Sequence, residues 1–460
     1  MIAPAASLEP YLQDASGYRG EAQQAFAPST LEELGDVVRR AAVERTPITI
    51  AGAGTGLTGA RVPHGGLVIS LERFRKLEIY AGRARCGAGL ALEDLHRDAA
   101  KMGQFFGPNP TESSASMGGI FSTNAGGARS FRYRSVRYQI LGIEVTFANG
   151  ESSWLRRGEK VDFAYQQVRQ PATTKNSAGY YLRPELDWVE LFAGSEGTLG
   201  IVTELEVQLL SHAPAILSGV VFFESDESAL NAVDAWRPIP ELRLLEFMDE
   251  YALAFLRPWY PEIPAGARAA LMVEQNLESE DDEEVDLWTE RLEKRKALKE
   301  TWFGFRPADH ARFREFRHKL AVLVTETARG NAFPKNATDF AVPIDRNREL
   351  HEYYKRRCEE LFPGQYTIFG HVGDANNHIN LLPKTREQAN QAEELIYEFA
   401  GKVVSMGGTV AAEHGIGKTK TNLLELMYTA REIESMRAVK RHLDPKWLLG
   451  QGTLFGTQPQ

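Results

Sequence analysis

Cysteine is almost absent from this chain of 460 residues, which has only Cys86 and Cys358. The two lie far apart and form no Cys-x-x-Cys pair, so they cannot hold an iron–sulfur cluster. Such sparse use of cysteine is typical of a reducing cytosol. The N-terminus also has no basic stretch followed by an apolar core, so no signal peptide is recognisable. We therefore expect a cytoplasmic protein.

Long apolar runs and an excess of positive charge are missing as well. No run of 18 apolar residues occurs, so we expect no membrane span. The formal net charge of −9 argues against a nucleic-acid partner and against an anionic membrane surface. The arginines interleaved with aromatic residues at 128–138 are therefore interpreted as solvated side chains, with one or two turned to cofactor phosphates or to an acidic partner.

Glycine, in contrast, is abundant, above all in the segment 107–127, GPNPTESSASMGGIFSTNAGG. Glycine loses much conformational entropy on folding, so such a run indicates backbone that lies against something large. A flexible linker is the alternative, but Ile120 and Phe121 interrupt the run and structured elements follow it. Backbone N–H groups and hydroxyls at close range favour a phosphorylated planar cofactor.

Two further glycine-rich turns support this interpretation. Residues 52–59 contain a G-x-G-x-x-G pattern after a strand expected at 48–50. A dinucleotide fingerprint must open a long helix, whereas here a second strand follows at 67–71, which predicts a different phosphate cradle made of N–H groups. The third turn, 191–200, also precedes a strand. Together the three turns predict one extended cofactor lying across an α+β domain that ends near residue 211.

The fold class is expected to be α+β, because helices and strands alternate without a strict βαβ rhythm. A helix is predicted over 30–44, with Thr30 as N-cap and Glu33 as its capping-box partner. Further helices are expected at 285–299 and 388–406, and late strands at 367–370, 378–382 and 408–412.

Three of the ten histidines fall in two short glycine-bounded stretches, GHVGDANNHIN (370–380) and AEHGIGK (412–418). A hairpin in the first stretch would bring His371 and His378 together. Two imidazoles and the carboxylate of Glu413 form a complete ligand set for a divalent metal with open coordination positions. The alternative is that these are hydrogen-bonded polar residues of the core.

Five motifs taken together carry a resemblance to a known family. They are GAGTGLTGARVP (52–63), GPNPTESSASMGGIFSTNAGG (107–127), LFAGSEGTLGIV (191–202), GHVGDANNHIN (370–380) and AAEHGIGK (411–418). In this order, over nearly the whole chain, they resemble the FAD-linked D-2-hydroxy-acid dehydrogenases of the vanillyl-alcohol oxidase superfamily. That group includes D-lactate dehydrogenases, the glycolate oxidase flavoprotein subunit and D-2-hydroxyglutarate dehydrogenase.

The resemblance implies an FAD-binding domain at 1–211, an α+β substrate-capping domain with a metal site at 212–435, and a return to the FAD domain at 436–460. The FAD pyrophosphate would lie on residues 52–59 and the flavin ring beside 107–127 and 196–202. The implied cofactor-binding residues are Gly52, Ala53, Gly54, Thr55, Gly56, Leu57, Thr58, Gly59, Pro108, Thr111, Gly118, Gly119, Ser122, Thr123, Asn124, Gly127, Glu196, Gly200, Ile201 and Val202.

For the chemistry, the resemblance implies that His371, His378 and Glu413 bind zinc, iron or manganese. His414 would be the base, Arg317 the partner of the substrate carboxylate, and Asn380 a substrate contact. Lys335 joins the candidate catalytic residues because it lies near Ala337, where D-2-hydroxyglutarate dehydrogenases have a substrate lysine. Ala337 itself favours lactate, glycolate or a longer monocarboxylate over a dicarboxylate.

The implied reaction is oxidation of a D-2-hydroxy acid to the 2-oxo acid. The metal would lower the pKa of the hydroxyl, His414 would accept its proton, and hydride would pass to flavin N5. Without a cysteine cluster, the electrons would pass to a separate acceptor such as a quinone or an acceptor protein. A homodimer and a flavoprotein subunit of a complex both stay open.

Two alternative functions remain at this stage. One is a flavoenzyme like alkyl-glycerone-phosphate synthase, which uses its flavin without net oxidation. The other is a flavoprotein subunit whose role is docking into an electron-transfer complex. Covalent attachment of the flavin also stays open because His64 lies near the first glycine loop.

Overall fold

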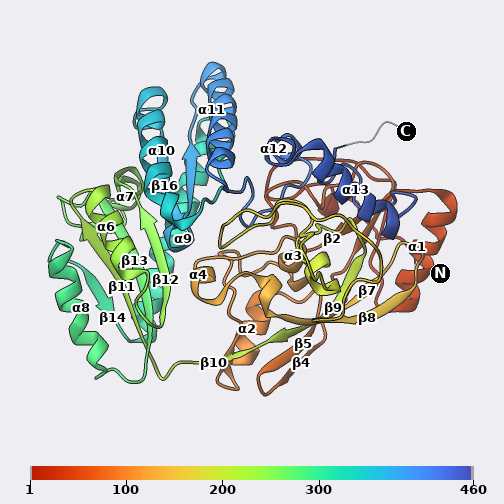
Figure 1. The fold of residues 1–460 in the computed structure, drawn as a ribbon, viewed down its shortest axis with the longest axis horizontal. Helices are drawn as coiled ribbons and strands as arrows, with labels where there is room; N and C mark the ends of the chain where they lie inside the picture. The colour runs from red at the N-terminus through yellow and green to blue at the C-terminus, as the bar shows by residue number, and fades with distance from the viewer. Residues whose placement is uncertain (1–2, 457–460) are drawn as a thin grey trace.

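The computed structural model describes residues 3–456, which form two lobes side by side (Figure 1). The first lobe is built from the N-terminal part of the chain and from its C-terminal end. The second lobe contains the middle of the chain. The structure thus has mixed helices and sheets, as the sequence predicts.

The first lobe contains three sheets. A five-stranded antiparallel sheet has the order β4-β5-β9-β7-β8, with β4 (Leu77–Tyr80), β5 (Arg83–Gly87), β9 (Ile201–Gln208), β7 (Ile140–Thr146) and β8 (Ser152–Arg156). A parallel sheet has the order β1-β3-β2, with β1 (Gln24–Phe26), β3 (Leu67–Ser70) and β2 (Ile48–Ala51). The short strands β6 (Gln104–Phe105) and β10 (Leu210–Ser211) form a third pair.

Helices of different lengths connect the strands of these sheets. They are α1 (Leu31–Glu44), α2 (Leu92–Ala100), α3 (Met117–Ser122), α4 (Ser130–Tyr133) and α5 (Trp188–Phe192). Helix α1 begins as predicted, because the Thr30 hydroxyl accepts a hydrogen bond from the Glu33 backbone N–H at 3.2 Å. The Glu33 carboxylate, however, caps Ser29 rather than Thr30, at 2.7 Å from the Ser29 backbone nitrogen, so the expected capping box is shifted by one residue.

The second lobe is one seven-stranded sheet. Its order is β14-β11-β13-β12-β16-β17-β15, with β14 (Trp302–Gly304), β11 (Ala215–Phe223), β13 (Ala269–Leu277), β12 (Leu242–Met248), β16 (Tyr366–His371), β17 (Asn376–Leu381) and β15 (Asn336–Ala337). The helices are α6 (Asp226–Trp236), α7 (Glu250–Leu256), α8 (Glu283–Lys294), α9 (Pro307–Gly330), α10 (Asn347–Leu361) and α11 (Arg386–Ser405). The predicted helices near 285–299 and 388–406 correspond to α8 and α11.

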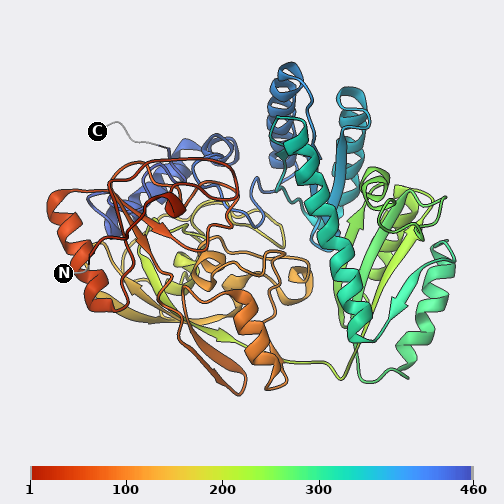
Figure 2. The ribbon, with the colours of Figure 1, turned by 180° about the vertical axis from the view of Figure 1, so that it is seen from behind.

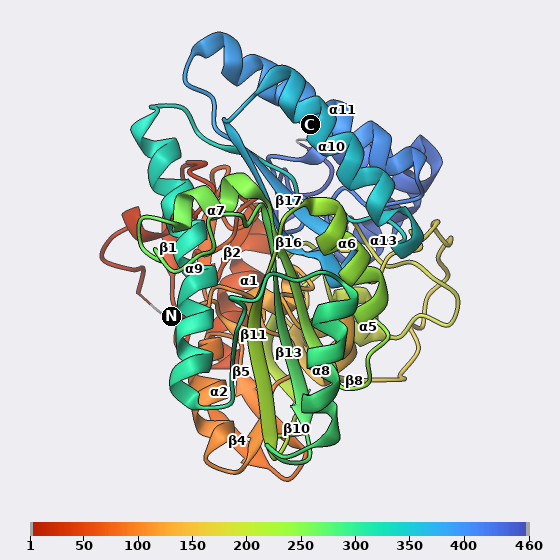
Figure 3. The same cartoon turned by 90° about the vertical axis from the view of Figure 1, so that its left-hand side faces the viewer.

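Both faces of this sheet are covered, because its strands are apolar on both sides. Val220 and Phe222 of β11 pack with α7 and α9, whereas Val221 and Phe223 pack in the main core with α6 and α8. Figure 3 shows the sheet between these two helix layers, and Figure 2 shows α9 running along the near face.

The predicted histidine hairpin is present as the antiparallel pair β16 and β17. Its tight turn places Ala375 in the left-handed region at φ 51°. A Cβ in that region is strained by roughly 1–2 kcal/mol. The expected strand at 408–412 is wrong: this segment makes only a single bridge, between Thr409 and Ala341.

After α11 the chain crosses back to the first lobe, where α12 (Thr421–Met427) and α13 (Ala430–Leu443) lie (Figure 1). The Ile48 N–H donates to the Leu448 carbonyl at 2.7 Å, and the Gly450 N–H donates to the Ile48 carbonyl at 2.8 Å. The exact domain limits stay a prediction. Within residues 3–456, no helix combines the length and the apolar character needed to cross a membrane.

Candidate active site and metal centre

The first lobe contains a large cavity whose walls are the three glycine-rich segments. Residues 52–58 form one wall, 115–126 the second, and parts of 196–202 the third. Glu413 and His414 also line it, so the late histidine stretch reaches the cavity from the C-terminal part of the chain.

The cavity wall has the properties that a phosphorylated cofactor requires. The backbone N–H groups of residues 54–58 have no hydrogen-bond acceptor within residues 3–456. A Cβ placed on Gly56 would meet one protein atom within 4 Å, Asp14 Oδ2 at 3.5 Å, and one on Gly119 would meet Ser116 Oγ at 3.0 Å. These glycines therefore keep the cavity open, and the N–H groups can form an anion nest.

Most of the predicted cofactor residues line this cavity. Those that do not are Gly59, Pro108, Asn124, Gly127 and Ile201. Three of them bind other parts of the protein. The Gly59 N–H donates to Asp14 Oδ2 at 2.9 Å, the Asn124 side chain donates to the Asn176 carbonyl at 3.0 Å, and the Gly127 N–H donates to Glu413 Oε2 at 2.7 Å.

His64 is not among the cavity-lining residues, and its Nε2 lies 2.8 Å from the Tyr18 hydroxyl. Of the four arginines in 128–138, Arg132 and Arg134 are exposed as expected, whereas the other two differ from the expectation. Arg129 and Arg137 are buried, and they bind Glu274 and the Ala193 carbonyl, respectively. These two arginines therefore stabilise the fold through internal contacts and are not solvated.

Beside the cavity, three imidazoles surround one carboxylate oxygen. The Nε2 atoms of His371, His378 and His414 lie 2.9, 3.7 and 3.9 Å from Glu413 Oε1. His371 and His378 come from the hairpin of the second lobe, and Glu413 and His414 from the loop that returns to the first lobe. The tertiary structure thus brings the predicted metal ligands and the predicted base together.

On its other side, each imidazole faces an oxygen. His371 Nδ1 pairs with Glu246 Oε1, His378 Nδ1 lies 3.0 Å from the Thr338 carbonyl, and His414 Nδ1 lies 3.6 Å from Asp339 Oδ2. For His371 and His378, the acceptor at hydrogen-bond distance from Nδ1 holds a proton there and presents Nε2 outward, which is the arrangement of metal-ligating histidines. The donor set therefore fits a divalent metal.

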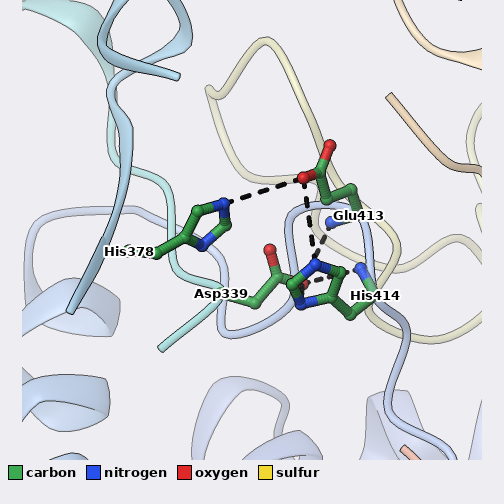
Figure 4. Close-up of side chains that lie close together, drawn as sticks. All are labelled: Asp339, His378, Glu413 and His414. Atoms are coloured by element: carbon green, nitrogen blue, oxygen red, sulfur yellow. Dashed lines mark hydrogen bonds and ion pairs between the residues drawn. The ribbon is translucent and has the colours of Figure 1, made fainter. Parts of the chain in front are cut away.

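The compact four-residue group drawn in Figure 4 differs from the predicted ligand set. Candidate ligand atoms of Asp339, His378, Glu413 and His414 all lie within 4.8 Å of one another. His371 is outside that group, and Asp339 is a residue that the sequence analysis did not select. Asp339 Oδ2 also accepts from the backbone N–H groups of Glu413 and His414, at 3.1 and 2.7 Å, which fixes this loop.

Burial and neighbouring charges give the three histidines different pKa values. Burial lowers the pKa of His378 to about 3, and it also lowers that of His414 despite the nearby Asp339. His371 is equally buried, but the Glu246 carboxylate raises its pKa to about 9. His414 is therefore a neutral imidazole near pH 7.

A second group of predicted residues lies around Glu246. Arg317 Nε donates to Glu246 Oε2 at 2.7 Å, and the guanidinium lies 5.0 Å from the centre of the Phe369 ring. In the part of the chain that the structure describes, the two Nη groups of Arg317 find no acceptor. Lys335 Nζ lies 3.2 Å from Asn380 Oδ1, and Asn380 Nδ2 is buried without a partner among the described residues. These open donors are what a carboxylate ligand requires.

Sequence reasoning missed three charged residues of the site, namely Lys175, Glu246 and Asp339. Glu246 could have been found, because it is a lone carboxylate in the wholly buried strand β12. Burial would raise its pKa, but His371 and Arg317 lower it to about 2. Lys175 lies in an irregular loop whose position only the folded chain reveals.

Comparisons with known proteins agree with this architecture. Residues 22–156 match the FAD binding domain family, and residues 213–454 match the C-terminal domain of FAD linked oxidases. Solved structures of alkyldihydroxyacetonephosphate synthase superpose with TM-scores of 0.65 and 0.67 at 14% and 16% identity, over 94% and 93% of this chain and 77% and 76% of theirs. At that identity the likeness shows the fold alone.

Named relatives cover nearly the whole chain. A D-2-hydroxyglutarate dehydrogenase of Xanthomonas citri is 30% identical over 94% of this chain and 88% of its own. A D-lactate dehydrogenase of Archaeoglobus fulgidus is 29% identical over 92% and 89%, and a glycolate oxidase subunit of Bacillus subtilis is 28% identical over 95% and 90%. The chain therefore belongs to the FAD-linked oxidases, as an oxidoreductase of the type that includes D-lactate, glycolate and D-2-hydroxyglutarate dehydrogenases.

Proposed function

We propose that this oxidoreductase oxidises a D-2-hydroxy acid, such as D-lactate, glycolate or a longer monocarboxylate, to the 2-oxo acid with assistance from a divalent metal. The observation that carries the proposal is the meeting of three imidazole Nε2 atoms around Glu413 Oε1 beside the glycine-lined cavity. Bound FAD would supply the hydride acceptor, and a metal on His371, His378 and Glu413 would supply Lewis acidity.

His414 is the proposed base. Asp339 Oδ2 lies 3.6 Å from its Nδ1, and the negative charge of this carboxylate favours a proton on Nδ1, which leaves the Nε2 lone pair to accept the substrate hydroxyl proton. Because burial keeps this imidazole neutral near pH 7, it is ready to act as a base.

Arg317 is the proposed partner of the substrate carboxylate. Glu246 holds its Nε and leaves both Nη groups available, so the guanidinium can bind two carboxylate oxygens side by side. The free donor on Asn380 and the half-buried Lys335 ammonium offer further contacts for the substrate.

Electrons are proposed to leave for a separate acceptor, a quinone or a protein. Both cysteines are free and buried, so neither supports an internal redox centre. A cytoplasmic location, a homodimer and a role as a subunit of a complex stay predictions. The likeness to alkyldihydroxyacetonephosphate synthase is a likeness of fold and supports no second function.

Anaerobic titration of the FAD-loaded protein tests the proposal. D-Lactate, glycolate, a longer D-2-hydroxy monocarboxylate and D-2-hydroxyglutarate would be compared with L-lactate, before and after a chelator has removed the metal, with metal content measured in parallel. We expect bleaching of the flavin absorption by D-lactate, glycolate or the longer monocarboxylate but not by L-lactate, and loss of bleaching on chelation. Bleaching that survives complete removal of the metal would disprove the metal's role, and no bleaching by any of these acids would disprove the substrate class.

A further inference from the structure

Lys175 is a buried cation beside the candidate metal centre. The proposed oxidation of a 2-hydroxy acid gives it no role. Its side chain has no solvent exposure. Nζ lies 3.0 Å from Glu413 Oε2, 3.3 Å from Asn376 Oδ1 and 3.5 Å from Asp374 Oδ2. Lys175 stands between β8 and α5 of the first lobe, whereas Asp374 and Asn376 belong to the hairpin turn of the second lobe. It therefore joins the two lobes at the candidate ligand Glu413.

The backbone around Lys175 is held in place by its neighbours. The Thr173 hydroxyl donates to the Lys175 carbonyl at 2.6 Å, and the Thr174 hydroxyl donates to the Asp374 carbonyl at 3.3 Å. The Ser177 N–H donates to the Ala411 carbonyl at 2.8 Å, two residues before Glu413. These bonds fix the ammonium group relative to the Glu413 loop.

The two oxygens of Glu413 have separate partners. Oε2 accepts from Lys175 and from the Gly127 N–H at 2.7 Å, whereas Oε1 faces the three imidazole Nε2 atoms. A carboxylate can bind a metal through one oxygen or through both. The Lys175 and Gly127 donors occupy Oε2, so only Oε1 is offered to the imidazoles.

We propose that Lys175 is a positioning residue that restricts Glu413 to a single oxygen at the metal centre. The restriction keeps coordination positions available for the two oxygens of a chelating 2-hydroxy acid. This inference rests on the proposed function, because it requires a metal on these ligands. Its chemistry is charge-assisted hydrogen bonding in a dry site, where such bonds hold a carboxylate firmly.

Cobalt(II) substitution tests the inference without turnover, because the visible spectrum of the bound ion reports its coordination. Oxalate serves as a redox-inert probe that chelates through two oxygens. In K175M, Glu413 Oε2 loses its cationic partner, so we expect an altered cobalt spectrum and at least about tenfold weaker oxalate binding. Cobalt itself should stay bound, because removing a buried positive charge increases the attraction for a divalent ion.

A matched control is K440M. Lys440 of α13 is another buried lysine, and its partner is the carboxylate of Asp444, which follows the helix. We expect K440M to lower thermal stability while leaving the cobalt spectrum and oxalate affinity unchanged. An unchanged spectrum and oxalate affinity in folded, FAD-loaded K175M would overturn the inference, and so would loss of cobalt from that variant. A wild-type protein that binds no cobalt would instead disprove the proposed metal site.

If K175M does not fold, the variant G126A tests the same inference. A Cβ at Gly126 would lie 3.0 Å from both Glu413 Oε2 and Lys175 Cε, so it displaces this pair without removing a charge. We expect a smaller change of cobalt spectrum and oxalate affinity in the same direction. Wild-type values for both would overturn the inference.

Discussion

At the scale of the residue, the different polar atoms of one charged side chain contact different partners. Glu246 contacts His371 with one oxygen and Arg317 with the other. Arg317 in turn uses Nε for Glu246 and keeps both Nη groups available. A buried charge is costly unless it is paired, so this division satisfies the structure and leaves donors for a ligand.

Arg317 provides the first prediction at this scale. R317M should raise the KM for the 2-hydroxy acid that reduces the flavin about 10–100-fold, because a charge-assisted pair of hydrogen bonds contributes about 1.5–3 kcal/mol. Steady-state kinetics with an artificial electron acceptor would measure this, with FAD content as the folding check. R317K keeps the charge but loses the planar fork, so an intermediate KM is expected. A KM near the wild-type value in R317M would remove Arg317 from the substrate site.

At the scale of the element, the glycine-rich segments act as a wall rather than as linkers. Part of 107–127 is the helix α3, which the glycine content did not predict. Gly118 packs closely, since a Cβ there would lie 2.7 Å from Ala88 Cβ, while Gly119 faces the open cavity. One short helix thus combines close packing on one side with an open cofactor surface on the other.

Filling the cavity from α3 should prevent cofactor binding. G119L places a bulky side chain where the cofactor is expected, so the variant should fold but purify with little or no FAD, as seen in its absorption spectrum. Gly401 of α11 is a matched control, because a Cβ there meets nothing within 4 Å. G401L should keep its FAD. Normal FAD content in G119L would place the cofactor elsewhere.

At the scale of the whole molecule, the lobes are joined by buried ion pairs. Glu274 of β13 binds Arg243 of β12 at 2.9 Å and Arg129 of the first lobe at 2.8 Å. Burial alone would raise the pKa of Glu274, but the two guanidinium groups lower it from 4.5 to about 2. Because its pKa is lower in the folded protein, ionised Glu274 stabilises the fold above about pH 4.5.

This linkage predicts an acid-sensitive junction. As the pH falls from about 4.5 to about 2, protonation should remove about 3 kcal/mol of stability, from 1.36 kcal/mol per pKa unit. Urea unfolding of the wild type and E274Q at about pH 7 and about pH 2 would measure this. E274Q should be less stable at pH 7 and should show a flatter pH dependence.

Asp36 is the matched control, because its pair with Arg39 is exposed to solvent. D36N should unfold like the wild type at both pH values. If E274Q kept the wild-type stability at pH 7, the ion pairs would not join the lobes energetically.

The sequence by itself determined the features that depend on local chemistry. Hydrophobic periodicity and the Thr30 cap predicted α1, and glycines and asparagines predicted the hairpin of β16 and β17. The glycine-rich turns predicted the residues that would surround the cofactor, and most of these residues line the cavity. These signals are local because a turn, a cap or a bare N–H depends on adjacent residues.

Only the tertiary structure decided which distant charges meet. Lys175, Glu246 and Asp339 come from three separate parts of the chain, and nothing in their neighbouring residues marks them as partners of Glu413 or the histidines. The burial of Arg129 and Arg137 was likewise invisible, because an arginine looks solvated until its partner is known. Long-range pairing depends on how sheets and lobes pack, which a local pattern does not contain.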